Sequence, residues 1–318
     1  MALHKTTSIH LTSQSKSTRR NNPSYTHPKS SSYFLIRSSR PYVHLPFLKG
    51  QLFSFSSTLI SVVAQAMRMR RRNCLIVVAL SAFALGSPLL IAGANPLAIK
   101  FYNSGVKKYK QGDYQGALFD YNKSLEIDPL NLDAIDNRSA AKYQLGDYKG
   151  AIADADEALQ IDPQHSVALN NRGASKMALK DYQGSILDYN KAISITPQYG
   201  DAFSNRCAAK RQLKDIQGAI SDCSRAIAID PQDAVAYSNR GAAKYELKNY
   251  SGAIADYNMA IKINPQYGLA YSNLGVSKYY QTGDAESSCN DFKKAASLGY
   301  EYRINWLNTE EGKWCRDM

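Results

Sequence analysis

The first 94 residues contain neither aspartate nor glutamate, although they carry 12 lysines and arginines. Residues 95–318 carry 27 basic and 27 acidic side chains, so the formal net charge of +12 belongs entirely to the N-terminal segment. Proteins that neutralise phosphates usually show a surplus of positive charge over their folded part. Because residues 95–318 have no such surplus, we expect no nucleic-acid partner for the folded part.

Histidine is almost absent from the neutral part, since four of the five histidines precede residue 95 and only His165 follows. One histidine supplies neither a metal site of the usual ligand spacing nor a nucleophile–base pair. The sequence also lacks a phosphate-binding glycine loop and a zinc-protease signature. We therefore predict no catalytic residue, no metal and no cofactor, and we predict that the protein is not an enzyme.

The N-terminal segment without acidic residues has the composition of a targeting sequence. Residues 1–66 are rich in serine, threonine, arginine and lysine, as in transit peptides. Residues 67–94 have the layout of an export signal: arginines after Met67, an apolar run from Cys74 to Ile91, and the small-residue ending Ala92-Gly93-Ala94. This layout predicts cleavage after Ala94 and export of the remainder.

Two alternatives to this interpretation of the leader stay open. The true start is Met67 or Met69 if residues 1–66 come from an overlong gene model, and export still follows. Residues 74–94 are also long enough to span a bilayer if they are not cleaved, which would leave an anchored protein. Membrane contact is therefore expected only if residues 74–94 are retained.

From residue 95 onward the sequence repeats every 34 residues. One set of prolines keeps this spacing: Pro129, Pro163, Pro197, Pro231 and Pro265. Asparagines keep it at Asn103, Asn137, Asn171, Asn205, Asn239 and Asn273, and lysines at Lys108, Lys142, Lys176, Lys210, Lys244 and Lys278. We call each such set of equivalent positions a column. A fixed period of this length predicts a stack of supersecondary units, because one unit alone cannot bury its apolar face.

One repeat, Val235–Gln266, reads as two helices and a turn. Its first half places aromatic and small residues four apart, on one helical face. The residues around Gly252 have turn composition, and the second half again shows helical spacing up to Pro265. Small residues fill three further columns and allow the helices of a hairpin to approach closely. The first of these columns holds Gly105, Ser139, Gly173, Cys207, Gly241 and Gly275.

These columns resemble the tetratricopeptide repeat family over about residues 98–300. The resemblance implies an all-α fold, a superhelix of about six helical hairpins whose first helices line a concave, peptide-binding groove. We place the repeat domain at 95–302, with repeats at 98–131, 132–165, 166–199, 200–233, 234–267 and a degenerate 268–302. Residues 303–318, together with Tyr302, are expected to form a C-terminal cap, in which Ile304, Trp306 and Leu307 cover the open end of the stack.

The asparagine column is the candidate peptide-binding site, because the resemblance places it on the concave surface. An amide offers a donor and an acceptor, so a ladder of amides suits the main chain of an extended ligand. Tyrosines suited to interfaces complete the candidate site at Tyr109, Tyr143, Tyr245 and Tyr279. The alternative is structural: the asparagines and the arginine column (Arg138, Arg172, Arg206 and Arg240) knit neighbouring repeats together.

Family members that clamp the carboxylate tail of heat-shock chaperones need lysines and a second asparagine on the first helices. This chain has Tyr102, Asp136, Asn170 and Ser204 in one lysine column, and Ile99, Asp133, Val167 and Asp201 in the other. Val106 and Ala140 stand in the second asparagine column. We therefore expect that the groove is not a carboxylate clamp for chaperone tails.

Two further features have structural interpretations. The aspartate column (Asp120, Asp154, Asp188, Asp222 and Asp256) is expected to pair with the arginine or lysine column and not to act in catalysis. Four cysteines follow residue 95, and four allow three pairings. Cys289 and Cys315 are a candidate disulfide that would hold the C-terminal segment to the last hairpin, whereas Cys207 and Cys223 are expected as small buried side chains.

The expected function is a non-catalytic scaffold that binds an extended peptide or a partner protein in a concave groove after export. The alternative is a membrane-anchored receptor, or an assembly or targeting factor, and a third option is a regulatory subunit of an enzyme made elsewhere. The NRGxAK and DYxGAIxDY strings resemble repeats common in photosynthetic bacteria and plastids. That resemblance implies the periplasm or the thylakoid lumen as the compartment.

Overall fold

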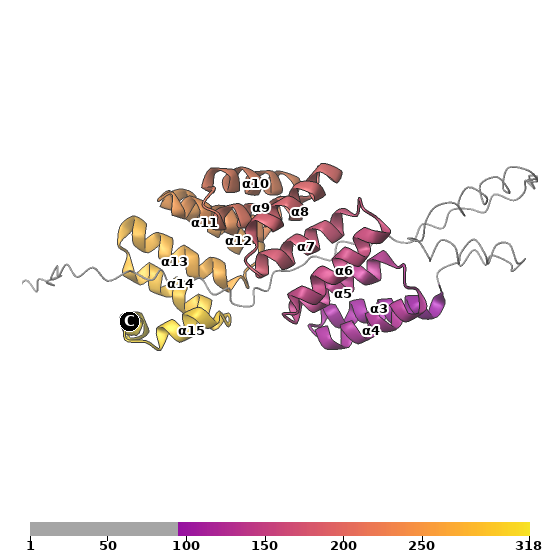
Figure 1. The fold of residues 1–318 in the computed structure, drawn as a ribbon. Helices are drawn as coiled ribbons and strands as arrows, with labels where there is room; N and C mark the ends of the chain where they lie inside the picture. The colour runs from indigo at the N-terminus through magenta and orange to yellow at the C-terminus, as the bar shows by residue number, and fades with distance from the viewer. Residues whose placement is uncertain (1–94) are drawn as a thin grey trace, which may run out of the picture. The chain divides into compact units, whose positions relative to one another are not determined.

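The computed structural model describes residues 95–318, which form fourteen α-helices and no strand (Figure 1). The prediction of an all-α fold of six hairpins is confirmed. The hairpins are α3 (Pro96–Lys110) with α4 (Tyr114–Ile127), α5 (Leu132–Gln144) with α6 (Tyr148–Ile161), α7 (Ser166–Ala178) with α8 (Tyr182–Ile195), α9 (Gly200–Gln212) with α10 (Ile216–Ile229), α11 (Ala234–Glu246) with α12 (Tyr250–Ile263), and α13 (Gly268–Thr282) with α14 (Ala285–Ser297). Two short helices follow, α15 (Glu301–Leu307) and α16 (Lys313–Arg316).

The hairpins stack in chain order. Each second helix packs against the first helix of the next hairpin, and the first helices of neighbouring hairpins also contact one another, from α3 and α5 to α11 and α13. Each repeat therefore contacts its neighbours in the stack, as in other α-solenoids. The predictions for residues 1–94, including the export signal, cleavage after Ala94 and a membrane anchor, lie outside the described residues. No helix within residues 95–318 combines the length and the apolar character needed to cross a membrane.

The hairpin turns explain one aspartate and one glycine in each of the first four repeats. Asp147 caps the N-terminus of α6, and its carboxylate accepts a hydrogen bond from the backbone N–H of Gly150 at 2.9 Å. A Cβ atom on Gly150 would collide with the Asp147 carboxylate, so a larger residue there would displace the capping side chain. Asn249 caps α12 in the same way, at 2.9 Å from the N–H of Gly252.

The residue before each cap differs between repeats. Gly112 and Gly146 adopt a φ of +81°, a left-handed conformation that glycine tolerates without strain. In the next three repeats the same conformation is adopted by lysines, at Lys180, Lys214 and Lys248, with φ between +60° and +68°. A side chain in this region costs free energy, which the rest of the hairpin must offset.

Within a hairpin, a glycine of the first helix meets an aromatic ring of the second. A Cβ atom on Gly173 would lie 2.7 Å from Tyr189 Cε1, and Tyr189 is fully buried. The pairs Gly105–Tyr121, Gly241–Tyr257 and Gly275–Phe292 repeat this contact. The small-residue column therefore makes room for a ring that sits sixteen or seventeen residues later.

The C-terminal segment packs on the last hairpin. The rings of Phe292 and Trp306 meet edge-on with centroids 5.2 Å apart, and Leu307 packs in the same cluster. The buried guanidinium of Arg303 lies over the Phe292 ring at 3.7 Å and donates a hydrogen bond to Ser272 Oγ at 2.8 Å. Tyr302 and Ile304, which were also expected to pack, are exposed.

Candidate functional site

The asparagine column does not behave as one uniform ladder. At two junctions between repeats, the asparagine donates a hydrogen bond to the preceding first helix. Asn137 Nδ2 donates to Tyr102 Oη at 3.0 Å, and Asn205 Nδ2 donates to Asn170 Oδ1 at 3.0 Å. Each bond joins a residue to the one 35 positions earlier. At these two junctions the asparagine knits repeats together.

At two other junctions the equivalent bond is not made. The residues 35 positions before Asn171 and Asn239 are Asp136 and Ser204. Asp136 Oδ1 and Ser204 Oγ are both buried without a hydrogen-bond partner. The side-chain amides of Asn171 and Asn239 likewise have no hydrogen bond within residues 95–318, although Asn171 is only 5% exposed. Donors and acceptors that the fold does not use therefore lie at these junctions.

The two end members of the column also keep unused amides. Asn103 is exposed on α3, and Asn273 is half-buried on α13. Neither side chain forms a hydrogen bond with the described part of the chain. The column thus separates into two groups. Asn137 and Asn205 form hydrogen bonds between repeats. The side-chain amides of the other four form none within the described residues: Asn103, Asn171, Asn239 and Asn273.

Most of the candidate tyrosines pack within the hairpins. Tyr109 is buried and meets Tyr114 edge-on, with ring centroids 5.1 Å apart, and its burial raises the pKa of the phenol to about 12. The rings of Tyr143 and Tyr148 also meet edge-on, at 5.3 Å, and those of Tyr245 and Tyr250 meet at a tilt, at 5.5 Å. Tyr279 differs, because it is 49% exposed at the end of α13. Of the four, Tyr279 is the one that presents its ring to solvent.

His165 and Asp136 form a close pair that the sequence did not indicate. His165 stands at the N-terminus of α7, and its Nε2 lies 2.6 Å from Asp136 Oδ2 on α5. The hydrogen bond to Asp136 raises the pKa of His165, and burial raises the pKa of Asp136. Asp136 thus has one oxygen on the imidazole and one oxygen, Oδ1, without a partner.

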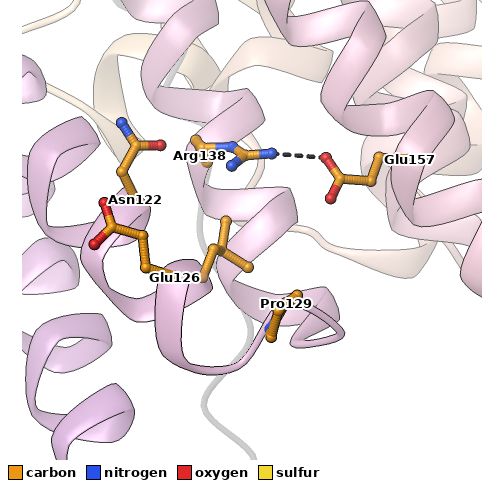
Figure 2. Close-up of a pocket in the computed structure, with 6 residues that line it drawn as sticks. Asn122, Glu126, Pro129, Arg138 and Glu157 are labelled. Carbon is orange, nitrogen blue, oxygen red and sulfur yellow. Dashed lines mark hydrogen bonds and ion pairs between the residues drawn. The ribbon is translucent and has the colours of Figure 1, made fainter. Parts of the chain in front are cut away.

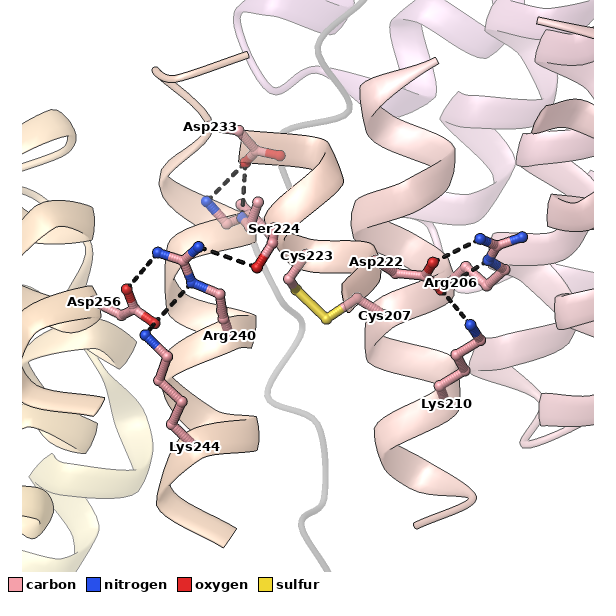
Figure 3. Close-up of a disulfide and its surroundings, with 12 residues drawn as sticks. Arg206, Cys207, Lys210, Asp222, Cys223, Ser224, Asp233, Arg240, Lys244 and Asp256 are labelled. Carbon is pink, nitrogen blue, oxygen red and sulfur yellow. Dashed lines mark hydrogen bonds and ion pairs between the residues drawn. A yellow bond between two sulfur atoms is a disulfide. The ribbon is translucent and has the colours of Figure 1, made fainter. Parts of the chain in front are cut away.

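The aspartate column binds both basic columns, as expected. Arg172 Nε and Nη2 reach the two oxygens of Asp188 at 3.0 and 2.5 Å, and Lys176 Nζ lies 2.7 Å from Oδ2. Figure 3 shows the same three-residue arrangement in the next two repeats, formed by Arg206, Lys210 and Asp222 and by Arg240, Lys244 and Asp256. These aspartates serve as counterions of the arginine and lysine columns.

The third nitrogen of each arginine reaches the preceding repeat. Arg172 Nη1 lies 2.7 Å from Asp156 Oδ1, and Arg206 Nη1 donates to Asn190 Oδ1 at 2.7 Å. Arg240 Nη1 donates to Ser224 Oγ at 3.2 Å, as Figure 3 shows. These contacts are the inter-repeat knitting that the structural alternative assigned to the arginine column.

Arg138 breaks this pattern and opens a pocket of about 350 Å³ (Figure 2). Its Nη2 bonds both Asp154 Oδ1 and Glu157 Oε2 at 2.8 Å, within its own repeat. Arg138 Nε and Asp154 Oδ2 stay unpaired, and the guanidinium forms no bond to Asn122 on α4, the counterpart of Asp156. The pocket lies between α4 with its following loop and the second repeat, and its lining mixes charged side chains with Leu125 and Pro129.

Two disulfides are present among the described residues. Cys289 in α14 is bonded to Cys315 in α16, the pair considered from the sequence. Cys207 in α9 is bonded to Cys223 in α10, a pair that the sequence interpretation did not make (Figure 3). The signal was available: the two cysteines replace the glycine and the tyrosine that face each other in neighbouring repeats.

Sequence comparison places known repeats at two stretches of the chain. Family models described as tetratricopeptide repeat match residues 137–200 and 234–267. Comparison with curated proteins gave no match.

Solved structures share the fold. A tetratricopeptide repeat protein from Parabacteroides merdae is 25% identical, with a TM-score of 0.57 over 67% of this chain and 84% of that one. A thermophilic protein of the same type from Thermus thermophilus is 16% identical, with a TM-score of 0.53 over 57% of this chain and 98% of that one. The Cut9–Hcn1 hetero-tetramer of the APC/C contains a chain that is 15% identical, with a TM-score of 0.61 over 69% of this chain and 42% of that one.

Proteins with this repeat are in general non-catalytic scaffolds that bind protein or peptide partners. The 34-residue period, the stacked hairpins and the matching repeat models agree with one another. The chain contains tetratricopeptide repeats, which the repeat models match at residues 137–200 and 234–267.

Proposed function

We propose that this protein is a non-catalytic scaffold that binds an extended peptide segment of a partner protein along its first helices. The observation that carries the proposal is the set of unused amides at Asn171 and Asn239, beside buried acceptors that the fold leaves unpaired. An unmade hydrogen bond at a buried polar group costs free energy, so such groups need a reason to persist. Binding a ligand supplies that reason.

Amides suit the main chain of an extended ligand, since each amide donates to a carbonyl and accepts from an N–H. The positions three residues after Asn171 and Asn239 hold Ala174 and Ala242, whose short side chains leave room for a peptide backbone. Asn273 and the exposed Tyr279 extend this surface onto α13. A peptide held in this way is recognised first by its backbone and only then by its side chains.

The test compares two sets of asparagines that differ in whether the fold uses them. Short random peptides displayed on phage are selected on the full chain, and the affinity of the selected peptides is measured by fluorescence polarisation. We expect Asn171→Ala/Asn239→Ala/Asn273→Ala to weaken binding about tenfold or more, with little change in the unfolding midpoint. The matched control is Asn137→Ala/Asn205→Ala, which removes the two bonds between repeats.

The control is expected to lower stability, by about 1 kcal/mol for each bond, while binding persists. If the control weakens binding and the first variant does not, the amides with no partner are not the binding groups. If no selected peptide responds to either set, the protein does not bind peptides along this column.

We also propose that the scaffold acts after export, with the chain beginning at Asn95. The signal-like residues 67–94 support this proposal, and so do two disulfides, which persist in oxidising compartments. Mass spectrometry of the protein isolated from its own cells measures the mature N-terminus. A chain that retains residues 74–94 would instead favour the membrane-anchored receptor, or assembly or targeting factor.

A further inference from the structure

The two edges of the stack differ in charge. The loops that join one repeat to the next contain no lysine or arginine; they are residues 128–131, 162–165, 196–199, 230–233 and 264–267. Three of these loops begin with an aspartate. At the opposite ends of the helices, the hairpin turns carry Lys180, Lys214 and Lys248 together with the capping aspartates Asp113, Asp147, Asp181 and Asp215, so their charges largely offset one another. An edge without basic residues attracts cationic groups and repels anionic ones.

Negative charge is concentrated around His165, where the second and third repeats meet. Asp136 bonds the imidazole directly, and Asp133 and Asp162 lie near enough to raise the pKa of His165 as well. Among the described residues, none of these three aspartates forms an ion pair with a lysine or arginine. Even a protonated His165 balances only one of the three carboxylates, so negative charge remains at this junction.

A second observation at the same junction points to a ligand. Asn171 is only 5% exposed, yet its side-chain amide has no hydrogen bond within the described residues. In the bonds Asn137–Tyr102 and Asn205–Asn170, each asparagine of the column faces the residue 35 positions earlier in the chain. By that register Asn171 faces Asp136, whose Oδ1 is itself unpaired. An unused amide and uncompensated carboxylates therefore meet at one place.

We propose that this junction selects an extended peptide carrying a lysine or arginine, with its main chain at Asn171 and its cationic side chain at Asp133 and Asp162. This inference rests on the proposed function and specifies in addition that the bound peptide carries a positive charge. A metal ion is a poorer occupant, because the described residues contain no group of three side chains placed to hold one. Nucleic acid and anionic lipid are repelled by the same carboxylates.

The experiment uses the peptide selection on the full chain and asks which residues are enriched. We expect a lysine or arginine at one fixed position of the selected peptides, and binding that weakens as salt concentration rises. Asp133→Asn/Asp162→Asn is expected to lower the affinity for these peptides about tenfold and to flatten the salt dependence. Asn264 accepts a hydrogen bond from the N–H of Gln266 as Asp162 does from Gln164, so asparagine preserves the local turn.

The matched control removes two charges from the other edge. Asp147 and Asp181 cap α6 and α8, and Asn249 performs the same capping in α12, so Asp147→Asn/Asp181→Asn keeps the fold. We expect this control to bind the selected peptides as the unaltered protein does. Equal losses of peptide affinity in both variants would reveal a general effect of the protein's charge and would overturn the assignment of the cationic side chain to Asp133 and Asp162.

The remaining outcomes separate this inference from the proposed function. Peptides that need Asn171 and Asn239 but show no basic residue would overturn the charge preference and leave peptide binding intact. Peptides insensitive to the asparagines would overturn both. If Arg70→Gln/Arg71→Gln/Arg72→Gln strengthens peptide binding severalfold, the chain's own basic segment occupies the junction, and the assignment to a partner peptide is wrong.

Discussion

Cys207 and Cys223 occupy, in the fourth repeat, the two facing positions that Gly173 and Tyr189 hold in the third. The ring of Tyr189 fills the space above Gly173, whereas the two cysteines close it with a bond of 2.05 Å and Cα atoms 5.4 Å apart. A covalent link thus replaces an aromatic contact between the same two helices. The disulfide thus holds the two helices of the fourth hairpin together where the third hairpin relies on packing of the Tyr189 ring.

Removing this disulfide is therefore expected to open the fourth hairpin. In a Cys289→Ser/Cys315→Ser background, Cys207→Ser/Cys223→Ser should lower the free energy of unfolding by about 3 kcal/mol, the usual effect for a loop of this length. Urea unfolding with and without a dithiol reductant measures it. Cys207→Gly/Cys223→Tyr should recover much of the loss and no longer respond to the reductant; a swap as unstable as the serine variant would contradict the equivalence of the two pairs.

The aspartate column supplies a second stability test. Asp188→Ala leaves Arg172 and Lys176 without their shared, nearly buried counterion, so we expect a loss of about 2 to 3 kcal/mol in the free energy of unfolding. Asp156→Ala removes the other partner of Arg172, a carboxylate that is 46% exposed, and should cost less than about 1 kcal/mol. Chemical denaturation compares the two, and equal losses would show that burial does not set the difference.

The lysines in left-handed turns predict a gain of stability. Lys180 has a φ of +68° where Gly146 has +81° in the preceding repeat. Lys180→Gly should raise the free energy of unfolding by about 0.5 to 1 kcal/mol, because relief of backbone strain exceeds the added freedom of the unfolded chain. Gly146→Lys is the reciprocal variant and should lower stability by a similar amount. Thermal unfolding of both checks the sign, and a loss in each would refute strain at Lys180.

The pair of His165 and Asp136 makes stability depend on pH. Both folded-state pKa values are raised, the first by the hydrogen bond between the two side chains and the second by burial. A raised pKa contributes stability below the ordinary value, and that stability is lost as the pH rises through the folded value. For His165 the loss begins near its ordinary pKa of 6.5 and continues at higher pH.

We therefore expect the free energy of unfolding to decline as the pH rises above 6.5, and the decline to vanish in His165→Asn. Asparagine suits the site, because Asn131 caps α5 at the matching position of the first repeat. Urea unfolding across a pH series supplies the measurement. Parallel profiles for the two proteins would rule out His165 as the titrating group.

The fold could be predicted because the columns record the packing. A proline after the second helix of each of the first five hairpins, and a glycine opposite Tyr121, Tyr189 or Tyr257, are local consequences of a hairpin that is repeated along the chain. The candidate site was harder to predict, because all six asparagines look alike in sequence. Whether an asparagine is used by the fold depends on the residue 35 positions earlier, which accepts its bond at Tyr102 and Asn170 but not at Asp136 or Ser204.

Features that depend on a residue found in a single repeat were missed. The hydrogen bond between His165 and Asp136 lies where later repeats pair Tyr199 with Asn170 and Tyr267 with Ser238, also 29 positions apart, and among these pairs the histidine is found in this one alone. The turn of Arg138 toward Glu157 depends on an acidic residue where other repeats have Lys191, Arg225 or Met259. A period reports what the repeats share, so single departures from it must be found in space.

Both disulfides close within a single hairpin or between the last hairpin and its cap, and none in residues 95–318 crosses from one repeat to the next. Under a pulling force on the two ends, the repeats can therefore separate one after another at their non-covalent junctions. The segments enclosed by Cys207–Cys223 and Cys289–Cys315 cannot lengthen until their bonds are reduced. Under such a force the fully extended chain is shorter in oxidising than in reducing surroundings. The difference is the length of chain that the two disulfides enclose.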